Sequence, residues 1–215
     1  MRDGVGKKKT GSWVENNGSL PAVGRNHLCK RLYLSLIHIL QPKYFEDYRG
    51  YYCETYSART LREQFGIETV FVQDNHSMTL KKGTIRGIHF QINPKPQQKL
   101  VRCTRGKVMD YVVDLKKDSP TFKKWISVEL SEDNRKQIWI PNGYGHAFLT
   151  LTDHCEVQYK VDEFYAPEYD RAIAWNDPEL ALDWGSITDP IVSAKDMAAP
   201  TLEKSDVNFT IKENG

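Results

Sequence analysis

The feature that most limits the possible folds of this chain is a series of short β-branched and aromatic runs separated by turn residues. The runs are "TVFVQDNHS", "GTIRGIHFQ", "KLVRCTRGKVMDYVVDLK", "KWISVELS", "QIWIPNGYGHAFLTLT" and "CEVQYKVDEFY". Turn signals such as "TRGK" and "SEDNRKQ" lie within or between them. Many short strands at near-regular spacing predict an all-β sandwich or barrel.

Helical patterns are few and short. "SARTLREQFG" predicts an amphipathic helix with Ser57 as its cap, Leu61 and Phe65 on one face, and Gly66 at its end. Weaker helical patterns occur in "DPELALDW" and around "SAKDMAAP". We therefore expect a β-rich domain with a few short peripheral helices.

The first 40 residues differ in composition from the rest of the chain. They are polar and rich in Gly, Asn and Lys until the apolar run "LYLSLIHIL", which can be read as a short edge strand. A stretch of a common transposase sequencing adaptor also encodes the sequence of residues 34–39. We predict that residues 1–40 are a disordered or adaptor-derived extension, residues 41–200 the domain, and residues 201–215 a C-terminal tail. Sequencing the locus across this junction would test the adaptor hypothesis, which an unbroken natural reading frame would contradict.

The charge of the chain bears on its partners, and its cysteine content bears on its compartment. The formal net charge is +2 with both signs mixed, and no apolar run approaches the ~18 residues of a membrane span, so neither nucleic acid nor membrane is expected as a partner. The four cysteines form no CxxC pair, which favours free thiols in a reducing cytoplasm.

His89 has three open interpretations: a metal ligand, a proton-transferring base, or a packed side chain. A metal site on a strand commonly uses an HxH pair, but here the second position is Gln91. His146, in "PNGYGHAF", could join them only as a weak set. For proton transfer, Arg86 would lie on the opposite face of a regular strand, and a bulge at Gly87 would bring both toward one cavity.

Basic residues within the β-rich region suit an anionic ligand. The predicted set is Arg49, Arg86, Lys99, Arg102 and Lys195. Any one of them could simply belong to a solvated face, but together with "VQDNHS" they would suit a phosphorylated ligand. Tyr159, Phe164, Tyr165 and Tyr169 could stack on a base or a sugar.

Several long segments resemble the dTDP-4-dehydrorhamnose 3,5-epimerase family, in order and with its spacings. They are "FVQDNHSMTLKKGTIRGIHFQINPKPQQKLVRCTRGKVMDYVVDLKKDSPTFKKW", "LSEDNRKQIWIPNGYGHAFLTL", "YKVDEFYAPEYDRAIAWNDPELALDW" and "SAKD". The resemblance covers about residues 41–200 and implies a cupin-type β-sandwich or jelly-roll barrel, usually a homodimer. It implies epimerisation at C3 and C5 of a dTDP-4-keto-6-deoxyhexose for dTDP-L-rhamnose biosynthesis, with no metal and no cofactor.

The resemblance also implies roles for particular residues. His89 would be the base, Asp196 the carboxylate that orients it, Tyr159 the acid on the opposite face, and Lys99 the cation that stabilises the enolate. Substrate contacts would come from Arg49, Glu54, Gln73, Asp74, Asn75, Arg86, His146, Tyr165, Asp170 and Lys195.

Some positions depart from the family pattern. Asp170 stands where many members have Glu, and Ala147 makes "HAF" of the commoner "HGF". The family's opening strand has no visible counterpart, which bears on dimer formation. Two alternatives stay open: an epimerase that inverts only C3 or C5 of a related dTDP-keto sugar, and a cupin that binds sugar nucleotides without turnover.

Overall fold

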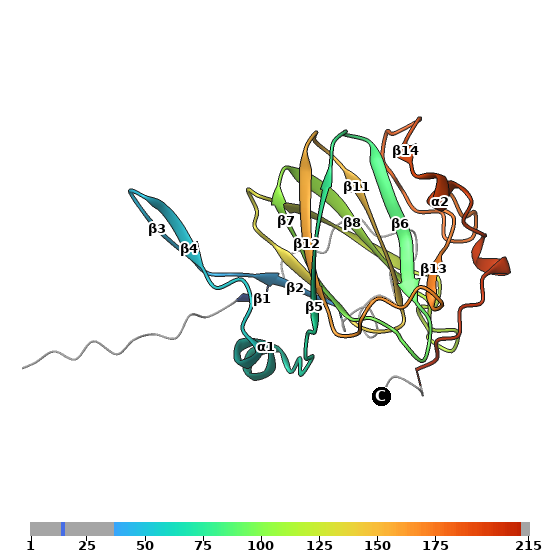
Figure 1. Cartoon of the computed structure of the whole chain (residues 1–215), viewed down its shortest axis with the longest axis horizontal. Coiled ribbons are helices and arrows are strands. Elements are labelled where there is room, and N and C mark those ends of the chain that lie inside the picture. The colour runs from blue at the N-terminus through green and yellow to red at the C-terminus, as the bar shows by residue number, and fades with distance from the viewer. Residues whose placement is uncertain (1–13, 16–36, 212–215) are drawn as a thin grey trace, which may run out of the picture.

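The computed structural model of the chain describes residues 14–15 and 37–211. Among these residues, strands dominate and helices are short (Figure 1). One group of strands comprises β1 (Val14–Glu15), β2 (His38–Gln41), β5 (Gln73–Thr79), β7 (Lys99–Arg105), β10 (Gln137–Ile140) and β12 (Cys155–Val161). A second group comprises β6 (Thr84–Gln91), β8 (Lys107–Asp114), β9 (Trp125–Ser131), β11 (Tyr144–Thr150), β13 (Asp170–Ala172) and β14 (Ile191–Val192). The remaining elements are β3 (Tyr44–Asp47), β4 (Gly50–Cys53), α1 (Ala58–Phe65), α2 (Ala194–Met197) and the 3₁₀ helix η2 (Leu202–Lys204).

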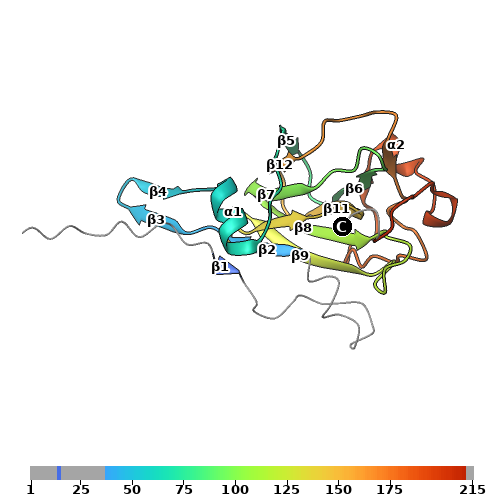
Figure 2. The same ribbon diagram turned by 90° about the horizontal axis from the view of Figure 1, so that it is seen from below.

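The two groups form two sheets that face each other. Within the described residues the first sheet has the order β1-β2-β10-β7-β12-β5, and the second has β13-β6-β11-β8-β9 with β14 added parallel to β6. Figure 2 shows the layers from below. The predicted all-β fold is confirmed, and the jelly-roll class is confirmed with the family below.

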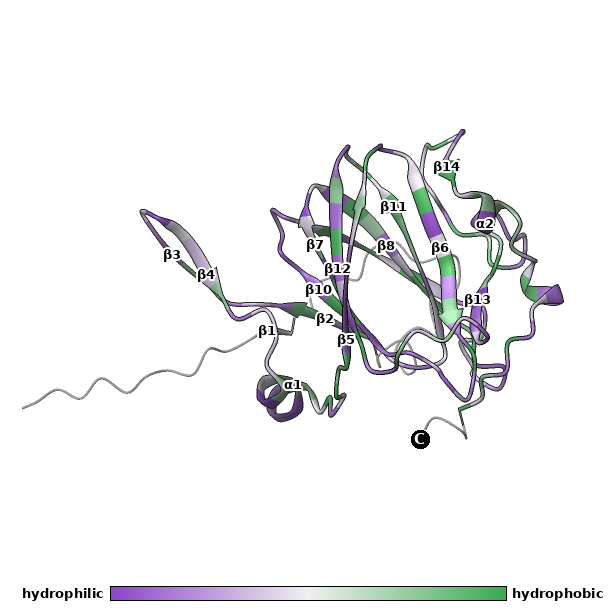
Figure 3. Cartoon of the chain, viewed as in Figure 1, coloured by the Kyte–Doolittle hydropathy of each residue, from purple (hydrophilic) through white to green (hydrophobic). Residues whose placement is uncertain are grey.

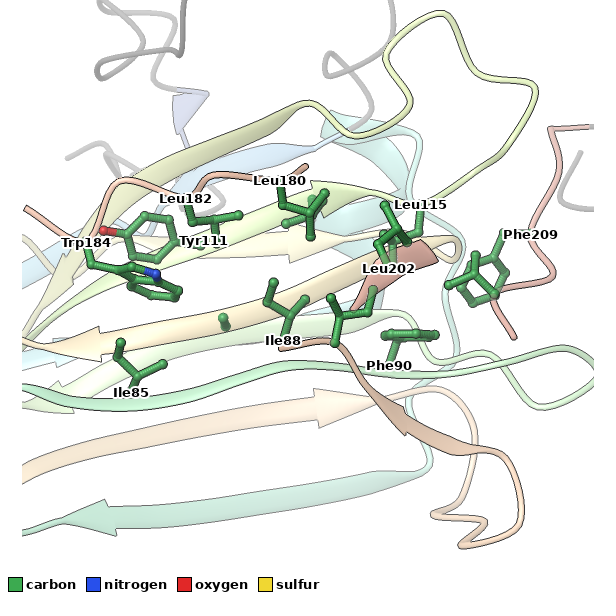
Figure 4. Close-up of a cluster of buried hydrophobic side chains, with 14 of the residues drawn as sticks. Ile85, Ile88, Phe90, Tyr111, Leu115, Leu180, Leu182, Trp184, Leu202 and Phe209 are labelled. Atoms are coloured by element: carbon green, nitrogen blue, oxygen red, sulfur yellow. The ribbon is translucent and has the colours of Figure 1, made fainter. Parts of the chain in front are cut away.

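Each face of the second sheet packs against a different core. Between the sheets, Val101 of β7, Val112 of β8 and Ile138 of β10 belong to one buried cluster. On the outer face, Ile88 of β6 and Tyr111 of β8 belong to another (Figure 4). The side chains of β6 therefore divide between two environments, and polar and apolar residues alternate along much of that strand (Figure 3). This division decides which of its side chains can reach the interior.

The C-terminal segment covers the outer face of the second sheet. Leu202, Val207 and Phe209 are buried there, and the Phe209 ring lies 6.0 Å from that of Phe90. Residues 201–211 therefore pack against the domain through these three side chains, which corrects the prediction of a tail from residue 201. The pattern was missed because the segment has no regular period: it holds a single 3₁₀ turn between extended stretches.

The sheet begins earlier than residue 41. β2 pairs with β10, which places His38 opposite Trp139, and Leu40 has no exposed surface. The predicted boundary at residue 41 therefore does not coincide with an element boundary. Except for residues 14–15 and 37–40, the predicted extension lies outside the described residues.

The helix predicted within residues 57–66 is present. Ser57 Oγ accepts a hydrogen bond from the Thr60 amide at 3.2 Å, and Gly66 ends α1 with a φ of 67°. β3 and β4 form a hairpin that projects away from the two sheets (Figure 1). Within residues 177–184, which carried a weaker helical pattern, residues 178–180 form a turn and the others have no regular structure. The α2 helix is a single short turn.

None of the helices in the described part of the chain has the length and apolarity needed to cross a membrane.

Candidate active site

The β6 strand contains a bulge at the position where the sequence predicts one. On β11, His146 lies opposite His89 and Phe148 lies opposite Arg86, so three steps along β6 match two steps along β11. The extra residue places Ile85 and Ile88 in the outer core and leaves Arg86 and His89 on the other face. The prediction of a bulge that turns these two polar side chains to one side is confirmed.

Gly87 is the residue that makes this bulge possible. Its φ is +125°, a conformation that side chains of L-residues rarely adopt. A Cβ atom at Gly87 would lie 2.5 Å from the Cβ of Ala147 and 2.7 Å from the carbonyl oxygen of His146. The close approach of β6 and β11 therefore requires glycine at this position.

His89 and Asp196 are in contact, although 107 positions separate them in the chain. The His89 Nε2 lies 2.6 Å from Asp196 Oδ1, and the Gly87 amide lies 3.4 Å from Asp196 Oδ2. Burial pushes the pKa of Asp196 upward, but its hydrogen bonds with His89 and Gly87 hold the net pKa below its usual value. The Asp196 side chain is 4% exposed and that of His89 is 34% exposed, so the carboxylate is sheltered while the imidazole remains accessible.

A second histidine–aspartate pair lies beside the first. His146 Nε2 is 2.8 Å from Oδ2 of Asp110, which is fully buried on β8. Asp110 was not among the predicted site residues. A carboxylate in the otherwise apolar run "KVMDYVVD" was the available signal, because buried charges are rare unless they are paired.

Lys99 and Tyr159 approach from the opposite sheet. On β7, Lys99 shares its face with Val101 of the inter-sheet core, and on β12 Tyr159 pairs directly opposite Val101. Burial lowers the pKa of Lys99 to about 8, although the charges of Asp110 and Asp170 oppose that effect.

Arg86 of the second sheet exerts an electrostatic effect on Tyr159 of the first sheet. Burial raises the pKa of the Tyr159 phenol, while the positive charge of Arg86 acts in the opposite direction. The Arg86 Nε donates a hydrogen bond to Thr79 Oγ1 at 3.0 Å. Thr79 is the last residue of β5, so this bond ties the Arg86 guanidinium to the first sheet. The phenol is therefore protonated at neutral pH and lies within the electrostatic reach of Arg86.

The predicted "QDN" residues of β5 divide between two faces. Gln73 and Asn75 lie on the Tyr159 side and hydrogen-bond each other at 2.9 Å. Asp74 faces the other way, is 73% exposed, and pairs with Lys160 at 2.8 Å. Side chains at positions i and i+1 of a strand point to opposite faces, so Asp74 is not brought together with the other two.

A polar cluster stands at the end of the site near β13. Asp170 Oδ2 lies 2.5 Å from Lys195 Nζ and accepts a hydrogen bond from the Tyr165 hydroxyl at 3.3 Å. The Tyr165 amide donates to Gln73 Oε1 at 3.3 Å. The structure therefore brings Tyr165, Asp170, Lys195 and Gln73 together.

Gln91, which breaks the HxH pattern, has a structural task. Its amide nitrogen donates to the carbonyl oxygens of Lys95 and Phe164, at 2.8 and 3.2 Å. Its oxygen accepts from the Ala166 amide at 2.8 Å. Gln91 therefore anchors both ends of the segment that carries Tyr165. Within residues 14–15 and 37–211, no three His, Cys, Asp or Glu side chains gather in an arrangement that could hold a metal ion.

Arg49 and Glu54 lie apart from this cluster. Arg49 is at the tip of the β3–β4 hairpin, where its guanidinium pairs with Asp47 at 2.6 Å. Glu54 follows β4 and accepts a hydrogen bond from the Thr60 hydroxyl at 3.2 Å. Figure 1 shows the hairpin on the far side of the molecule from β6. A single chain does not bring these two residues to His89.

Known proteins resemble this chain in sequence and in structure. A sequence model of dTDP-4-dehydrorhamnose 3,5-epimerase matches residues 31–204, which is most of the chain. The chain belongs to the dTDP-4-dehydrorhamnose 3,5-epimerase family. The family match starts at residue 31, so it includes β2, which corrects the expectation that the region before residue 41 has no counterpart in the family.

Individual relatives agree with the family match. The dTDP-4-dehydrorhamnose 3,5-epimerase of Salmonella typhimurium is 46% identical over 167 residues, which cover 78% of this chain and 91% of the relative. A crystal structure of the epimerase from Bacillus anthracis, with TDP and pyrophosphate bound, has a TM-score of 0.76 and 45% identity, and the match covers 80% of this chain and 98% of that one. The enzyme from Legionella pneumophila, in complex with dTDP-4-keto-L-rhamnose, has a TM-score of 0.77 and 39% identity, with 81% and 92% covered.

These comparisons confirm three predictions: the family, the cupin-type fold, and an isomerase activity of the dTDP-4-dehydrorhamnose 3,5-epimerase class. The roles of individual side chains stay predictions.

Proposed function

We propose that His89 and Tyr159 carry out the inversion at C3 and C5 of a dTDP-4-keto-6-deoxyhexose, acting from opposite sides of the sugar. The observation that carries the proposal is their placement: His89, paired with Asp196, comes from the second sheet, and Tyr159 comes from the first. Inversion needs a proton removed from one face and returned to the other, and two facing sheets can supply the two groups.

The 4-keto group makes this chemistry accessible to a side-chain base. It acidifies the C–H bonds at C3 and C5, so an imidazole near neutral pH can remove either proton. The contact at 2.6 Å with Asp196 would orient His89 and stabilise the imidazolium that forms. Lys99 would face the oxygen on which negative charge develops in the enolate.

The charge of Lys99 predicts a pH dependence. The pKa of Lys99 is about 8, so the ammonium is present below that pH and is lost as the pH rises through it. We expect turnover to fall above pH ~8 as the enolate loses its counter-charge. The measurement is the initial rate between pH 6 and 10 at saturating substrate. A flat profile through pH 9 in the parent would contradict this role, and Lys99→Met should be slow at every pH.

Replacing Tyr159 with phenylalanine should separate proton removal from inversion. His89 could still take a proton and return a deuteron from solvent to the same face, but the acid for the other face would be gone. In D2O we expect deuterium to enter the substrate with its configuration retained, and little epimer to form. Proton NMR of the recovered sugar distinguishes the two outcomes. Inverted product at the parent rate would remove Tyr159 from the acid role.

We propose the substrate-binding residues from their positions around His89 and Tyr159. Arg86 and His146 would contact the hexose, because they lie on the His89 face of the second sheet. Gln73, Asn75, Tyr165 and Lys195 would contact the nucleotide, with Tyr165 stacking on thymine and Lys195 on the diphosphate. Asp74, on the outer face, is the weakest member of the predicted set.

We further propose a homodimer in which the hairpin of one protomer extends over the site of the other. The hairpin projects from the body (Figure 1) and carries exposed aromatics: Phe45, Tyr48, Tyr51 and Tyr52. Exposed aromatic side chains are typical of interfaces. Arg49 and Glu54 would then bind the partner's nucleotide. Mixing an inactive Arg49→Ala protein with an inactive His89→Ala protein should restore part of the activity if subunits exchange, because one site of the mixed dimer would hold both native residues.

We propose a cytoplasmic location because of the state of the cysteines. Cys53, Cys103 and Cys155 are unbridged, which fits a reducing compartment, and Cys29 lies outside the described residues.

The function is tested by incubating dTDP-4-keto-6-deoxyglucose with the protein in D2O and following C3 and C5 by NMR. Deuterium at both carbons, with formation of the L-sugar, is the expected result. Deuterium at only one carbon would point to a single-carbon epimerase. Binding of dTDP without exchange would point to a binding module.

A further inference from the structure

The β3–β4 hairpin is a separate two-stranded sheet that projects away from the two larger sheets in both views (Figures 1 and 2). A two-stranded hairpin on its own is only marginally stable in water, so a rigid one needs support from the rest of the chain. Tyr48, at the tip, follows the four residues of β3, which span about 13 Å as an extended strand. A tilt of about 10° at the base would therefore move the tip by about 2 Å.

The turn between β9 and β10 supplies such support through Arg135. The Cζ atom of Arg135 lies 4.3 Å from the ring centroid of Tyr44 and 4.3 Å from that of Tyr51. The two rings lie 5.0 Å apart and meet edge to face. Arg135 Nη1 also pairs with Glu46 Oε1 at 2.9 Å. One side chain from the body of the protein thus contacts both strands of the hairpin.

Strand alternation places these three partners on one face of the hairpin. Tyr44 and Glu46 are i and i+2 on β3, and Tyr51 pairs directly opposite Glu46. The other face carries the cross-strand pair Phe45 and Tyr52, which are 48% and 69% exposed. The guanidinium therefore holds one face of the hairpin and leaves the other face open.

The aromatic rings contribute more to this contact than the ion pair does. The Glu46 side chain is 64% exposed, and exposed ion pairs usually contribute little. The Arg135 side chain is only 27% exposed, and its Nε is buried with no hydrogen-bond partner among the described residues. A cation over an aromatic face is attracted more strongly when it is partly desolvated, and a flat guanidinium stacks on rings in a way that an ammonium does not. The contact therefore depends on arginine and not simply on a positive charge.

The turn that carries Arg135 is itself fixed by Asn134. The side-chain oxygen of Asn134 accepts from the amides of Ser131 and Lys136 at 3.1 and 3.0 Å, and its nitrogen donates to the Glu129 carbonyl at 2.8 Å. Arg135 has a φ of 55°, in the left-handed region that residues other than glycine seldom occupy. Such a conformation persists where the surroundings determine it, so the position of Arg135 is well defined.

The same region also ties both ends of the hairpin to the first sheet. Before β3, the side-chain amide of Gln41 donates to the Asn134 carbonyl oxygen at 3.0 Å. After β4, the side-chain amide of Gln137 donates to the Thr55 carbonyl oxygen at 3.0 Å. The hairpin is thus held at its base by these two bonds and along one face by the guanidinium.

We propose, on the basis of the proposed homodimer, that Arg135 is a positioning residue: it holds the hairpin of its own chain so that Arg49, at the tip, enters the nucleotide site of the partner. Arg135 touches no substrate and acts only through Arg49. Its effect on an active site therefore comes from the opposite subunit. A substrate contact or a generally stabilising residue would not have that property.

Mixed dimers test this property, because they separate the chain that supplies His89 from the chain that supplies Arg49. A His89→Ala chain and an Arg49→Ala chain with different affinity tags are co-expressed, and the mixed dimer is purified through both tags. It holds one complete site, with His89 from the Arg49→Ala chain and Arg49 from the His89→Ala chain. Arg135→Gln is then added to one chain at a time, and KM and kcat for dTDP-4-keto-6-deoxyglucose are measured.

Arg135→Gln on the His89→Ala chain is expected to raise KM about 3- to 30-fold, the range of a partly desolvated cation–π contact, with kcat little changed. Arg135→Lys on that chain should restore only part of the loss. Arg135→Gln on the Arg49→Ala chain should change neither constant, and this arm also shows that the substituted chain folds. Arg105→Gln on the His89→Ala chain is the matched control: Arg105 is 60% exposed and pairs with Glu156 at 3.6 Å, so it should have no effect.

An equal rise of KM in both arrangements would overturn the proposal, because Arg135 would then stabilise the subunit in general or act on the site of its own chain. No rise in either arrangement, or an equal rise with Arg105→Gln, would also overturn it. Absence of activity in the mixed dimer that keeps Arg135 in both chains would instead reject the shared site of the proposed function, on which the role of Arg135 rests.

Discussion

Replacing His89 with alanine is expected to lower the rate of deuterium exchange at both C3 and C5 by about 10²–10⁴-fold, the usual contribution of a positioned general base. The side chain is one-third exposed, so the change removes chemistry without leaving a large cavity. The rate is read as deuterium incorporation in D2O, because exchange reports proton removal even when inversion fails.

A control distinguishes loss of the base from loss of the fold. His89→Ala should bind dTDP with the parent's affinity, because the proposed nucleotide contacts lie near β5 and β13. Asp196→Asn should lose less than His89→Ala, since the imidazole would remain but without a charged partner. Parent-level exchange at both carbons in His89→Ala would assign the base to another residue, with His146 the first to test.

Gly87→Ala is expected to be the most destabilising single methyl addition in the site. The new Cβ would meet the Ala147 Cβ at 2.5 Å, and the φ of +125° would itself be strained. Steric overlap and backbone strain each cost about 1–3 kcal/mol, so the free energy of unfolding should fall by roughly 3 kcal/mol or more. Activity should also fall, because relief of the clash moves His89 relative to Asp196.

Gly50 provides a matched control for this substitution. Its φ is +124°, almost the same as that of Gly87, but no atom lies within 4 Å of where a Cβ would be. Within one chain, Gly50→Ala therefore adds backbone strain without a steric clash, and the difference between the two variants measures the contact of Gly87 with Ala147. Denaturant unfolding at one fixed protein concentration gives both values. Equal losses of stability would show that the strand contact at Gly87 is unimportant.

Local sequence patterns predicted the features that depend on neighbouring residues in the chain, such as helix ends and a strand bulge. The cap at Ser57 and the left-handed end at Gly66 were readable because each lies within a few residues of the helix it bounds. The bulge at Gly87 was predictable because only glycine tolerates such a backbone, and because two polar residues three positions apart would otherwise face opposite ways.

Long-range features were beyond these patterns. The contact between Asp196 and His89 rested on family resemblance alone, since no local period links residues 107 positions apart. The burial of Phe209 was missed because its segment is irregular, and Asp110 because its strand reads as apolar core. Strand alternation predicts that Asp74 faces away from Gln73 and Asn75, as the structure shows, and its contact with the substrate stays a prediction.

The C-terminal segment that supplies Asp196 has a consequence for the order in which the enzyme matures. On the ribosome, the strands bearing His89, Lys99 and Tyr159 emerge before α2, and the residues that pack this segment down, among them Phe209, emerge last. A chain that ended before α2 would hold the sequence of every strand and still lack the partner of its base. Catalytic competence would be among the last properties that the chain acquires, because Asp196 and the residues that pack its segment down are synthesised after every strand of the two sheets.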